Sequence, residues 1–310
     1  LYKNNGNKKE VLVDGIRVIL IEPCNTKYLK PKFYFNSRLV KKEIKKIKPD
    51  VVNVIDNPAM VLATANIKIP TVYTIHGIKS IEAKLWKGRD FLSHQAEGIL
   101  EKYFLKKYKR FIAISPYVKN IIESKDYKNN VIYEVPNALS EKCLNYLRGD
   151  KPEEDIFTIV NIGTYTHLKS QHILLEVLSE LEGKIQFKCI LCGNSDDRKY
   201  FEYLRSFKSK ITNLEISEAK TQDEIYTLMS MSSLMLHTSK QENTPMVFLE
   251  AFAMKLPIIS SKVGGIDYLL RNDKYGTTYN YGDKEQIKNL IIDFYNNREK
   301  YNDKAEKAYQ

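Results

Sequence analysis

The chain has 310 residues, more than one hydrophobic core usually holds, and 43% of them are hydrophobic, so two domains of about 150 residues, each with its own core, are expected. No apolar run approaches the roughly 18 to 20 residues of a membrane helix and no segment resembles a signal peptide, which predicts a soluble, cytoplasmic protein. The formal net charge of +11 is uneven, because residues 1–150 hold 28 Lys and Arg against 15 Asp and Glu, whereas residues 151–310 hold 21 against 23. A basic half of this kind suits nucleic acid, an anionic membrane or a phosphate-bearing substrate.

Short β-rich runs alternate with helical patterns along the first half of the chain. The predicted strands are residues 16–22, 50–56, 70–77, 110–116 and 131–137, and the predicted helices are residues 38–48, 97–107 and 116–124. The alternation predicts a parallel α/β layer. Ligands of such layers bind beyond the carboxyl ends of the strands, where His76-Gly77 and Pro136-Asn137 stand.

The densest basic run of the first half lies on the amphipathic helix predicted at residues 38–48. Its lysines are Lys41, Lys42, Lys45, Lys46 and Lys48. Such a run is typical of a solvated helix face, and it would also attract an anionic membrane surface.

A polar stretch at residues 148–155 indicates a linker, and a second α/β series follows it. The predicted strands of this series are residues 157–163, 186–193, 213–217, 234–239 and 256–261, and the predicted helices are residues 170–181, 197–207 and 221–232. Two Rossmann-like halves joined in this way predict a ligand held in a cleft between them.

The four cysteines, Cys24, Cys143, Cys189 and Cys192, are too few and too irregularly spaced for a disulfide scaffold. Cys189 and Cys192 form a C-x-x-C, but they lie inside a predicted buried strand, where a separation of three puts the thiols on opposite faces. We therefore expect core cysteines instead of a zinc or redox site.

The stretch SKQENTPMVFLEAFAMKLPIISSKVGG, residues 239–265, carries two glutamates eight residues apart, Glu242 and Glu250. On one continuous helix the two carboxylates would lie roughly 12 Å apart on one face, too far to share a proton and suited to gripping two ends of an elongated ligand. Pro245 favours a helix that begins near it, with Glu242 on the preceding loop and Glu250 on the helix.

With Pro257, Ile258, Gly264 and Gly265 in register behind the glutamates, this stretch resembles the Glu-x7-Glu signature of the family 4 glycosyltransferases, which are retaining enzymes of the GT-B type. The resemblance is strong over residues 161–276 and weaker over residues 50–139. It implies two Rossmann-like domains facing each other across a cleft. Residues 1–150 would form the acceptor-side domain, whose N-terminal part is expected to be missing because the chain begins at Leu1, and residues 151–310 the donor-binding domain.

The resemblance implies that Glu242 contacts the donor sugar and Glu250 the ribose hydroxyls. The backbone amides at the start of the helix would hold the donor diphosphate, which agrees with the positive end of a helix dipole. These donor-binding residues are Asn243, Thr244, Pro245, Met246 and Val247.

The segment NIGTYTHLKSQHILLEVL, residues 161–178, resembles the second phosphate-binding segment of the family. By this match Gly163 lets the backbone approach the diphosphate, and Lys169 neutralises charge on the leaving nucleotide. Thr164 stands where the family usually has Arg, and a hydroxyl cannot replace a bidentate guanidinium. Either another cation compensates or the enzyme is slower.

In the first half, the run YTIHG, residues 73–77, resembles the strand of the family that ends in a histidine reaching the donor sugar, which makes His76 a candidate for that contact. The acceptor bound by this domain would be a glycan or a lipid-linked sugar, used in cell-surface polysaccharide or glycolipid synthesis. The basic half could then hold the enzyme at the inner face of an anionic membrane.

The reaction implied is transfer of a hexosyl or N-acetylhexosaminyl group from a nucleotide-diphosphate sugar, with a UDP-sugar favoured over a GDP-sugar, to an acceptor hydroxyl. No Asp-x-Asp occurs in the chain, which argues for a metal-independent site without a cofactor. A sugar-nucleotide epimerase or hydrolase of the same fold and an inactive relative stay open. A nucleic-acid-binding protein is disfavoured because no RNA- or DNA-binding module is recognisable, and a dinucleotide-dependent oxidoreductase because no G-x-G-x-x-G follows a strand.

Overall fold

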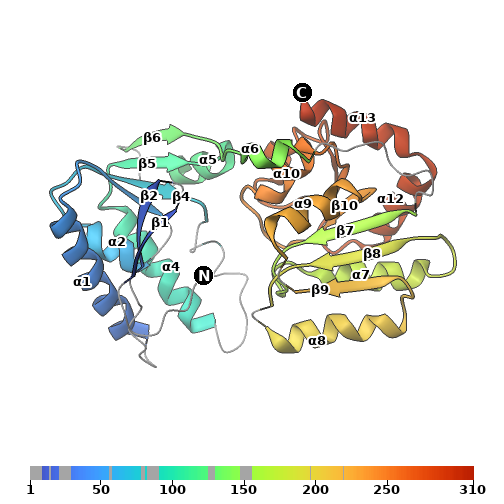
Figure 1. Ribbon diagram of the computed structural model, residues 1–310, viewed down its shortest axis with the longest axis horizontal. Coiled ribbons are helices and arrows are strands. Elements are labelled where there is room, and N and C mark those ends of the chain that lie inside the picture. Colours follow the sequence, from blue (N-terminus) through green and yellow to red (C-terminus); the bar gives the residue numbers. More distant parts are fainter. Residues whose placement is uncertain are drawn as a thin grey trace. The chain divides into compact units, whose positions relative to one another are not determined.

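The computed structural model describes residues 9–13, 15–20, 29–55, 58–77, 81, 91–124, 130–146, 156–195, 197–218 and 220–310. The chain forms two compact units, residues 1–114 with 118–135, and residues 115–117 with 136–310. The predicted linker at residues 148–155 and Cys24 lie outside the described residues. Both units are drawn in Figure 1.

The first unit contains a parallel sheet with the strand order β3-β4-β5-β6, as the alternating pattern predicted. Its strands are β3 (Val52–Ile55), β4 (Thr71–Ile75), β5 (Arg110–Ala113) and β6 (Val131–Glu134), and its helices are α1 (Leu29–Ile47), α2 (Pro58–Thr64), α4 (Phe91–Leu105) and α5 (Pro116–Ser124). Phe111 at the centre of β5 is fully buried, and Tyr73 and Tyr108 pack around it.

Two expectations for the first unit are corrected. The run at residues 16–22 is not a strand of the parallel layer: β2 (Ile16–Leu20) pairs antiparallel with β1 (Lys9–Val13) in a separate two-stranded sheet. Val13 pairs with Ile16 and Gly15 is at φ +77°, and in the sequence Asp-Gly at this place is a strong hairpin signal. Helix α1 begins at Leu29, nine residues before the prediction, because a proline such as Pro31 is tolerated in the first helical turn.

The second unit is a doubly wound domain with six parallel strands in the order β12-β11-β10-β7-β8-β9. Its strands are β7 (Thr158–Ile162), β8 (Lys188–Cys192), β9 (Leu214–Ser217), β10 (Leu234–His237), β11 (Ile258–Ser261) and β12 (Thr277–Tyr279). Its helices are α6 (Glu141–Leu144), α7 (Gln171–Leu181), α8 (Arg198–Ser206), α9 (Gln222–Ser230), α10 (Met246–Ala253), α11 (Ile266–Leu269), α12 (Lys284–Asn296) and α13 (Arg298–Tyr309), with a 3₁₀ turn at Phe207–Ser209.

Both faces of this sheet are covered, and the strand residues alternate between two hydrophobic clusters. In β7, Ile159 belongs to the cluster with α7, α8 and α12, whereas Val160 belongs to the cluster with α9 and α10. In β11, Ile259 and Ile258 are divided in the same way. This burial on both sides explains why these strands are continuous apolar runs.

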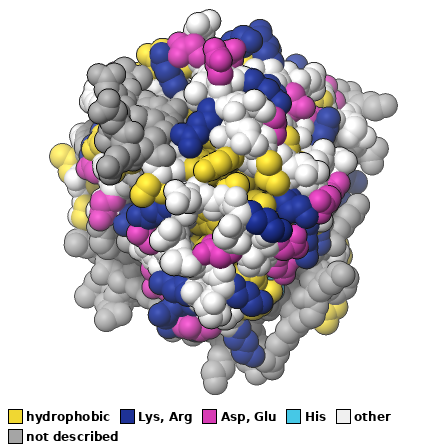
Figure 2. Space-filling model, turned by 90° about the vertical axis from the view of Figure 1, so that its right-hand side faces the viewer, with side chains coloured by type: hydrophobic (Ala, Val, Ile, Leu, Met, Phe, Trp, Pro, Cys, Tyr) yellow, Lys and Arg dark blue, Asp and Glu magenta, His cyan; other side chains and the backbone are white. Residues whose placement is uncertain are grey.

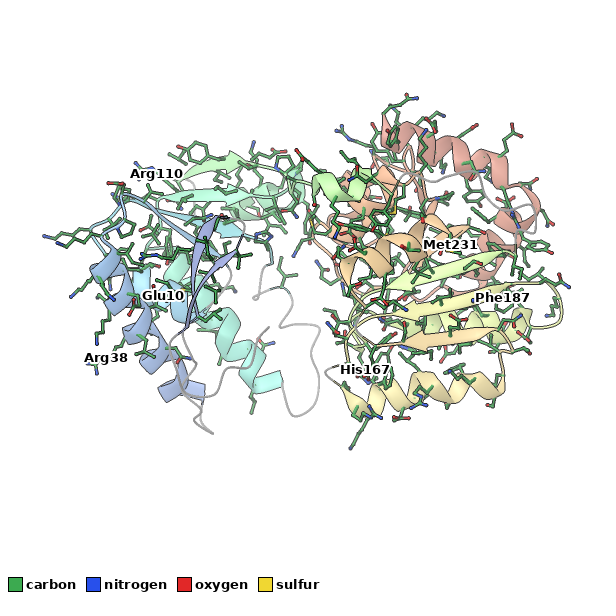
Figure 3. The ribbon with its side chains drawn as sticks, viewed as in Figure 1. Glu10, Arg38, Arg110, His167, Phe187 and Met231 are labelled. Carbon is green, nitrogen blue, oxygen red and sulfur yellow. The ribbon has the colours of Figure 1, made fainter. Side chains whose placement is uncertain are left out.

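The strand order creates a topological switch point between β7 and β10. From β7 the chain winds outward through β8 and β9, then returns to the other side of β7 and winds outward through β10, β11 and β12. At such a point the loops after the two central strands diverge and leave room for a ligand. His167, which follows β7, and Phe187, which precedes β8, lie at opposite ends of the sheet and mark its polarity in Figure 3.

The prediction that the two cysteines of the C-x-x-C are buried in a strand is confirmed. Cys189 and Cys192 lie in β8, both are free thiols, and both are almost fully buried. Burial raises the pKa of each thiol, so neither is poised to react. Within the described ranges, no group of three or more His, Cys, Asp or Glu side chains could hold a metal ion.

Candidate functional site at the switch point of the second unit

The loop after β7 begins with a close backbone crossing. Gly163 donates its N–H to the carbonyl of Cys192 at 2.9 Å. A Cβ on Gly193, which follows β8, would lie 2.0 Å from the carbonyl oxygen of Gly163, so only glycine fits there. The β7 loop and the β8 end are therefore locked together at the carboxyl end of the sheet.

Lys169 folds back over Gly163. A Cβ added to Gly163 would lie 3.9 Å from Cδ and Cε of Lys169, so the lysine stem runs across the bare glycine backbone. The loop is also tied to the segment that follows β10, because Thr238 Oγ1 donates to the carbonyl of Lys169 at 2.9 Å and the N–H of Lys240 donates to the carbonyl of Leu168 at 2.7 Å. The two segments predicted from sequence, one with Gly163 and Lys169 and the other with Glu242, are thus neighbours.

Glu242 lies on the loop between β10 and α10, as Pro245 predicted, and its side chain is only 10% exposed. Its Oε1 accepts hydrogen bonds from Lys169 Nζ and from His237 Nε2, the latter at 3.0 Å. Burial alone would raise the pKa of this carboxyl. The hydrogen bond from His237 and the charge and hydrogen bond of Lys169 outweigh the burial and lower the pKa to about 2. Glu242 is therefore an ionised, firmly held carboxylate.

Gly264 and Gly265, the Gly-Gly pair of the motif, pack against the backbone of the loop that carries Glu242. A Cβ on Gly264, at φ +55°, would lie 1.8 Å from the carbonyl oxygen of Glu242, and a Cβ on Gly265 would lie 2.0 Å from that of Asn243. The N–H of Gly265 also donates to the carbonyl of Glu242 at 3.0 Å. Two bare glycines let the loop after β11 lie directly against the backbone that carries Glu242.

Helix α10 begins at Met246 with Pro245 as its N-cap. The N–H groups of a first helical turn have no partner within the helix, so this end can bind an anion. The Thr244 hydroxyl lies beside this helix end and is available to a ligand. Its Oγ1 is one of two buried side-chain polar atoms without a hydrogen-bond partner in the described part of the chain. Met246 is exposed and Val247 half-buried.

Glu250 occupies the second turn of α10, as predicted, in a different environment. It is half-buried, and its Oε1 accepts one hydrogen bond, from Gln222 Nε2 of α9 at 3.0 Å. Burial raises the pKa of Glu250, and the neutral Gln222 offsets this only in part. Its charge also contributes to raising the pKa values of Cys143 and Tyr226 beside it, in which burial is the larger cause.

The remaining predicted site residues lie in different settings. Thr164 is half-buried, and its carbonyl accepts a hydrogen bond from Gln171 Nε2 at 3.0 Å. His76 belongs to the first unit, where it follows β4 directly at the carboxyl end of the strand and is exposed. The sugar contact assigned to His76 stays a prediction.

Sequence reasoning missed His237. It is the last residue of β10 and 5% exposed, it contacts Glu242, and it received no role from the sequence. The signal was a polar residue ending an otherwise apolar strand, five residues before a motif glutamate. Gln222, the partner of Glu250, carried no comparable signal, because it is one of several polar residues at the start of α9.

Two family models match the chain. The model described as Glycosyl transferases group 1 matches residues 147–310, and the model described as Glycosyltransferase Family 4 matches residues 3–141. The first match covers more than half of the chain and contains Lys169, Glu242 and Glu250.

Curated relatives agree at low identity. The chain is 25% identical over 236 residues to the uncharacterized glycosyltransferase MJ1178 of Methanocaldococcus jannaschii, which covers 75% of this chain and 60% of that protein. It is 24% identical over 150 residues to the N-acetyl-alpha-D-glucosaminyl L-malate synthase of Bacillus anthracis, which covers 48% of this chain and 39% of the synthase. The chain thus spans less than two thirds of the length of either relative.

Solved structures share the fold. The sucrose-phosphate synthase of Thermosynechococcus elongatus superposes with a TM-score of 0.84 at 14% identity, covering 99% of this chain and 81% of that one. Anabaena HepE in complex with UDP-glucose gives a TM-score of 0.68 at 19% identity, covering 88% of this chain and 76% of that one. The expected GT-B class with two Rossmann-like domains is confirmed, and the chain belongs to the family of glycosyl transferases group 1.

Proposed function

We propose that this protein transfers a sugar from a nucleotide-diphosphate sugar to an acceptor hydroxyl. The observation that carries the proposal is the ionised Glu242 held beside the ammonium of Lys169, just ahead of the N-terminus of α10, at the switch point of a Rossmann-like sheet. A sugar hydroxyl donates to a carboxylate, and a diphosphate accepts from an ammonium and from free amides. The site thus has complementary groups for both parts of such a donor.

The family resemblance implies a role for each group, and the chemistry of the group suits that role. The amides of residues 243–247 and the backbone at Gly163 and Thr164 bind the diphosphate. Lys169 neutralises the charge that grows on the leaving phosphate, and Glu242 accepts a hydrogen bond from a hydroxyl of the donor sugar. Glu250 binds the ribose hydroxyls, and a donor-sugar contact by His76 is part of the proposal.

We propose that transfer retains the anomeric configuration. A double-displacement mechanism needs a nucleophilic carboxylate about 5 Å from an acid. Glu242 already accepts hydrogen bonds from Lys169 and His237, which makes it a poor nucleophile and a poor proton carrier. The acceptor oxygen would attack from the face that the phosphate leaves. The bond from the anomeric carbon to the phosphate oxygen breaks, the bond to the acceptor oxygen forms, and the acceptor proton passes to the leaving phosphate.

The donor and its requirements are also proposals. We favour a UDP-linked hexose or N-acetylhexosamine, and the solved HepE complexes contain UDP or UDP-glucose. We expect no cofactor and no metal ion, because an ammonium and a helix terminus can stabilise the diphosphate charge.

We further propose a glycan or lipid-linked acceptor and binding of the protein to the inner face of an anionic membrane. Lys41, Lys42, Lys45 and Lys46 are exposed on α1, and each could contribute roughly 1 kcal/mol at such a surface. No described helix has both the length and the apolar character to cross a bilayer. The second unit differs from this basic helix: on the face of it that Figure 2 shows, Lys and Arg are interspersed with Asp and Glu. Sedimentation should therefore give binding to anionic vesicles at low salt that high salt abolishes; no binding at low salt contradicts the membrane proposal.

The activity test is a thermal-shift panel of UDP-, GDP- and ADP-sugars, followed by product analysis with glycan and lipid-linked acceptors. A donor at 100 times its dissociation constant should stabilise the protein by about 2.7 kcal/mol. Glycosylated acceptor supports the proposal. A sugar still attached to the nucleotide would indicate an epimerase, free sugar without transfer a hydrolase, and no shift with any nucleotide sugar would contradict the proposal. Nucleic-acid binding has no support in the family to which the chain belongs.

A further inference from the structure

His237 is held on several sides at the end of β10. Its Nδ1 lies 3.2 Å from Ser260 Oγ and its Nε2 lies 3.0 Å from Glu242 Oε1. The ring meets Phe248 of α10 edge-on at 5.1 Å between centroids, and its backbone carbonyl accepts a hydrogen bond from the Tyr279 hydroxyl. The imidazole can therefore neither rotate nor leave without disturbing the loop that carries Glu242.

The protonation pattern of this contact is constrained. Because Oε1 of an ionised carboxylate only accepts hydrogen bonds, Nε2 must carry a hydrogen. Nδ1 then either accepts a hydrogen bond from the Ser260 hydroxyl, or is itself protonated while that hydroxyl donates to the carbonyl of Ser261 at 3.2 Å. In both cases His237 donates to Glu242.

The two oxygens of Glu242 have different partners. Both His237 and Lys169 bind Oε1, and no described residue hydrogen-bonds Oε2. An oxygen left in this way can accept from a ligand hydroxyl while the other keeps the carboxylate in place.

We propose that His237 is a positioning residue for transfer, which holds Glu242 by Oε1 so that Oε2 meets a hydroxyl of the donor sugar. This inference rests on the proposed function. Lys169 alone could not do this work, because in that function its ammonium turns to the leaving phosphate, and His237 is then the donor that keeps Glu242 oriented. A histidine that only filled the core would need no protonated Nε2 aimed at the motif glutamate.

A matched pair of substitutions separates positioning from packing. His237→Gln can keep an N–H near the place of Nε2, whereas His237→Asn can keep one near Nδ1, toward Ser260, and loses the contact with Glu242. We expect kcat to fall by about 10- to 100-fold in His237→Asn, the usual effect of losing a hydrogen bond to a charged group, and the Gln variant to recover most of it. Affinity for free UDP should stay within about twofold in both variants, since both keep the charge of Glu242 and its pairing with Lys169. Equal kcat losses in the two variants, with equal losses of thermal stability, would overturn the proposal.

A second measurement does not depend on activity. In the whole chain labelled with ¹⁵N-histidine, the His237 signal, assigned by its loss in His237→Asn, should show a protonated Nε2 whose hydrogen exchanges slowly with solvent. Substituting Glu242→Leu should make that exchange fast. An unprotonated Nε2 overturns the inference even if the enzyme transfers sugar, whereas a protonated, protected Nε2 in a protein that binds no nucleotide sugar supports the contact and contradicts the proposed function.

Discussion

Glu242 and Glu250 belong to one motif, yet their surroundings have opposite effects on their charge. Glu242 lies on a loop, is bound by Lys169 and His237, and has a pKa lowered to about 2. Glu250 lies on α10, accepts from the neutral Gln222 as its one hydrogen-bond partner among the described residues, and has a raised pKa. Both carboxyls lose solvent, so the difference comes from their partners and not from burial. One end of the site is thus built around a fixed charge, and the other around a carboxylate that a ligand can stabilise.

The largest effect should come from removing the cation at the Glu242 end. Lys169→Met should lower the transfer rate by about 100- to 1,000-fold, because the growing charge on the leaving phosphate loses its ammonium. Single-turnover kinetics with the best donor would measure it. Lys199→Met is the control, since that exposed lysine lies on α8. A similar small loss in both variants would remove Lys169 from the mechanism.

The next prediction exchanges the two glutamates for their neutral isosteres. Glu242→Gln should lower kcat by about 10- to 100-fold while tightening free UDP about two- to fivefold, because Lys169 becomes available to the phosphates. Glu250→Gln should weaken UDP about tenfold and leave kcat nearly unchanged. Calorimetric titration with UDP and with the intact donor distinguishes the two. If each variant lost both ligands equally, the assignment of the glutamates to opposite ends of the donor would be wrong.

The backbone beneath Glu242 offers a stability test of the same end. Gly264→Ala should destabilise the protein by more than about 3 kcal/mol, since the new Cβ would meet the carbonyl oxygen of Glu242 at 1.8 Å and the residue is at φ +55°. Gly183→Ala is the matched control: it has φ +76° but open space around the added Cβ, so it should cost only about 1 kcal/mol. Urea unfolding gives both values, and equal costs would mean that the loop moves aside freely.

A smaller effect should appear in the pH dependence. Glu250, whose pKa is raised by burial, becomes protonated first as pH falls from neutral, so its contribution to ribose binding should fade by a few fold before the pH reaches the ordinary range of a glutamate. Glu242 stays ionised throughout, and the stability gained from its depressed pKa is lost only as pH falls from the unfolded-state value through about 2. The ratio of UDP affinities between the wild type and Glu250→Gln cancels the titration of UDP itself. A ratio that does not change with pH contradicts the prediction.

The smallest expected effect is that of metal removal. Both ends of the proposed site rely on side-chain charges and backbone amides, so transfer should continue at an undiminished rate after exhaustive dialysis against EDTA. Loss of activity restored only by magnesium or manganese would show that the diphosphate needs a cation that Lys169 does not supply.

Much of the second unit could be predicted from sequence because its signals are local. Continuous apolar runs gave β7, β8, β10 and β11, and Pro245 gave the start of α10, since each depends on neighbours within a few residues. Elements were missed in both units, α2 in the first and β12, α12 and α13 in the second, and β2 was assigned to the parallel sheet although the sequence Asp14-Gly15 signals a turn. The division of the chain near residue 150 and the ligand roles of the site residues stay predictions.

The chemical groups of the site could be read from the order of residues: two motif glutamates, a lysine before a helix, and glycines where the backbone must approach. How these groups act on one another depends on the folded chain. Lys169 and Glu242 are 73 residues apart in the chain, and His237 meets Ser260 across two adjacent strands. Gly264 is required because a loop 22 residues away in sequence crosses it at atomic contact. The ionised state of Glu242, the hydrogen on His237 Nε2 and the contact of Gly264 with the Glu242 carbonyl each depend on a pair of groups. These pairs form only when the sheet brings β7, β10 and β11 side by side.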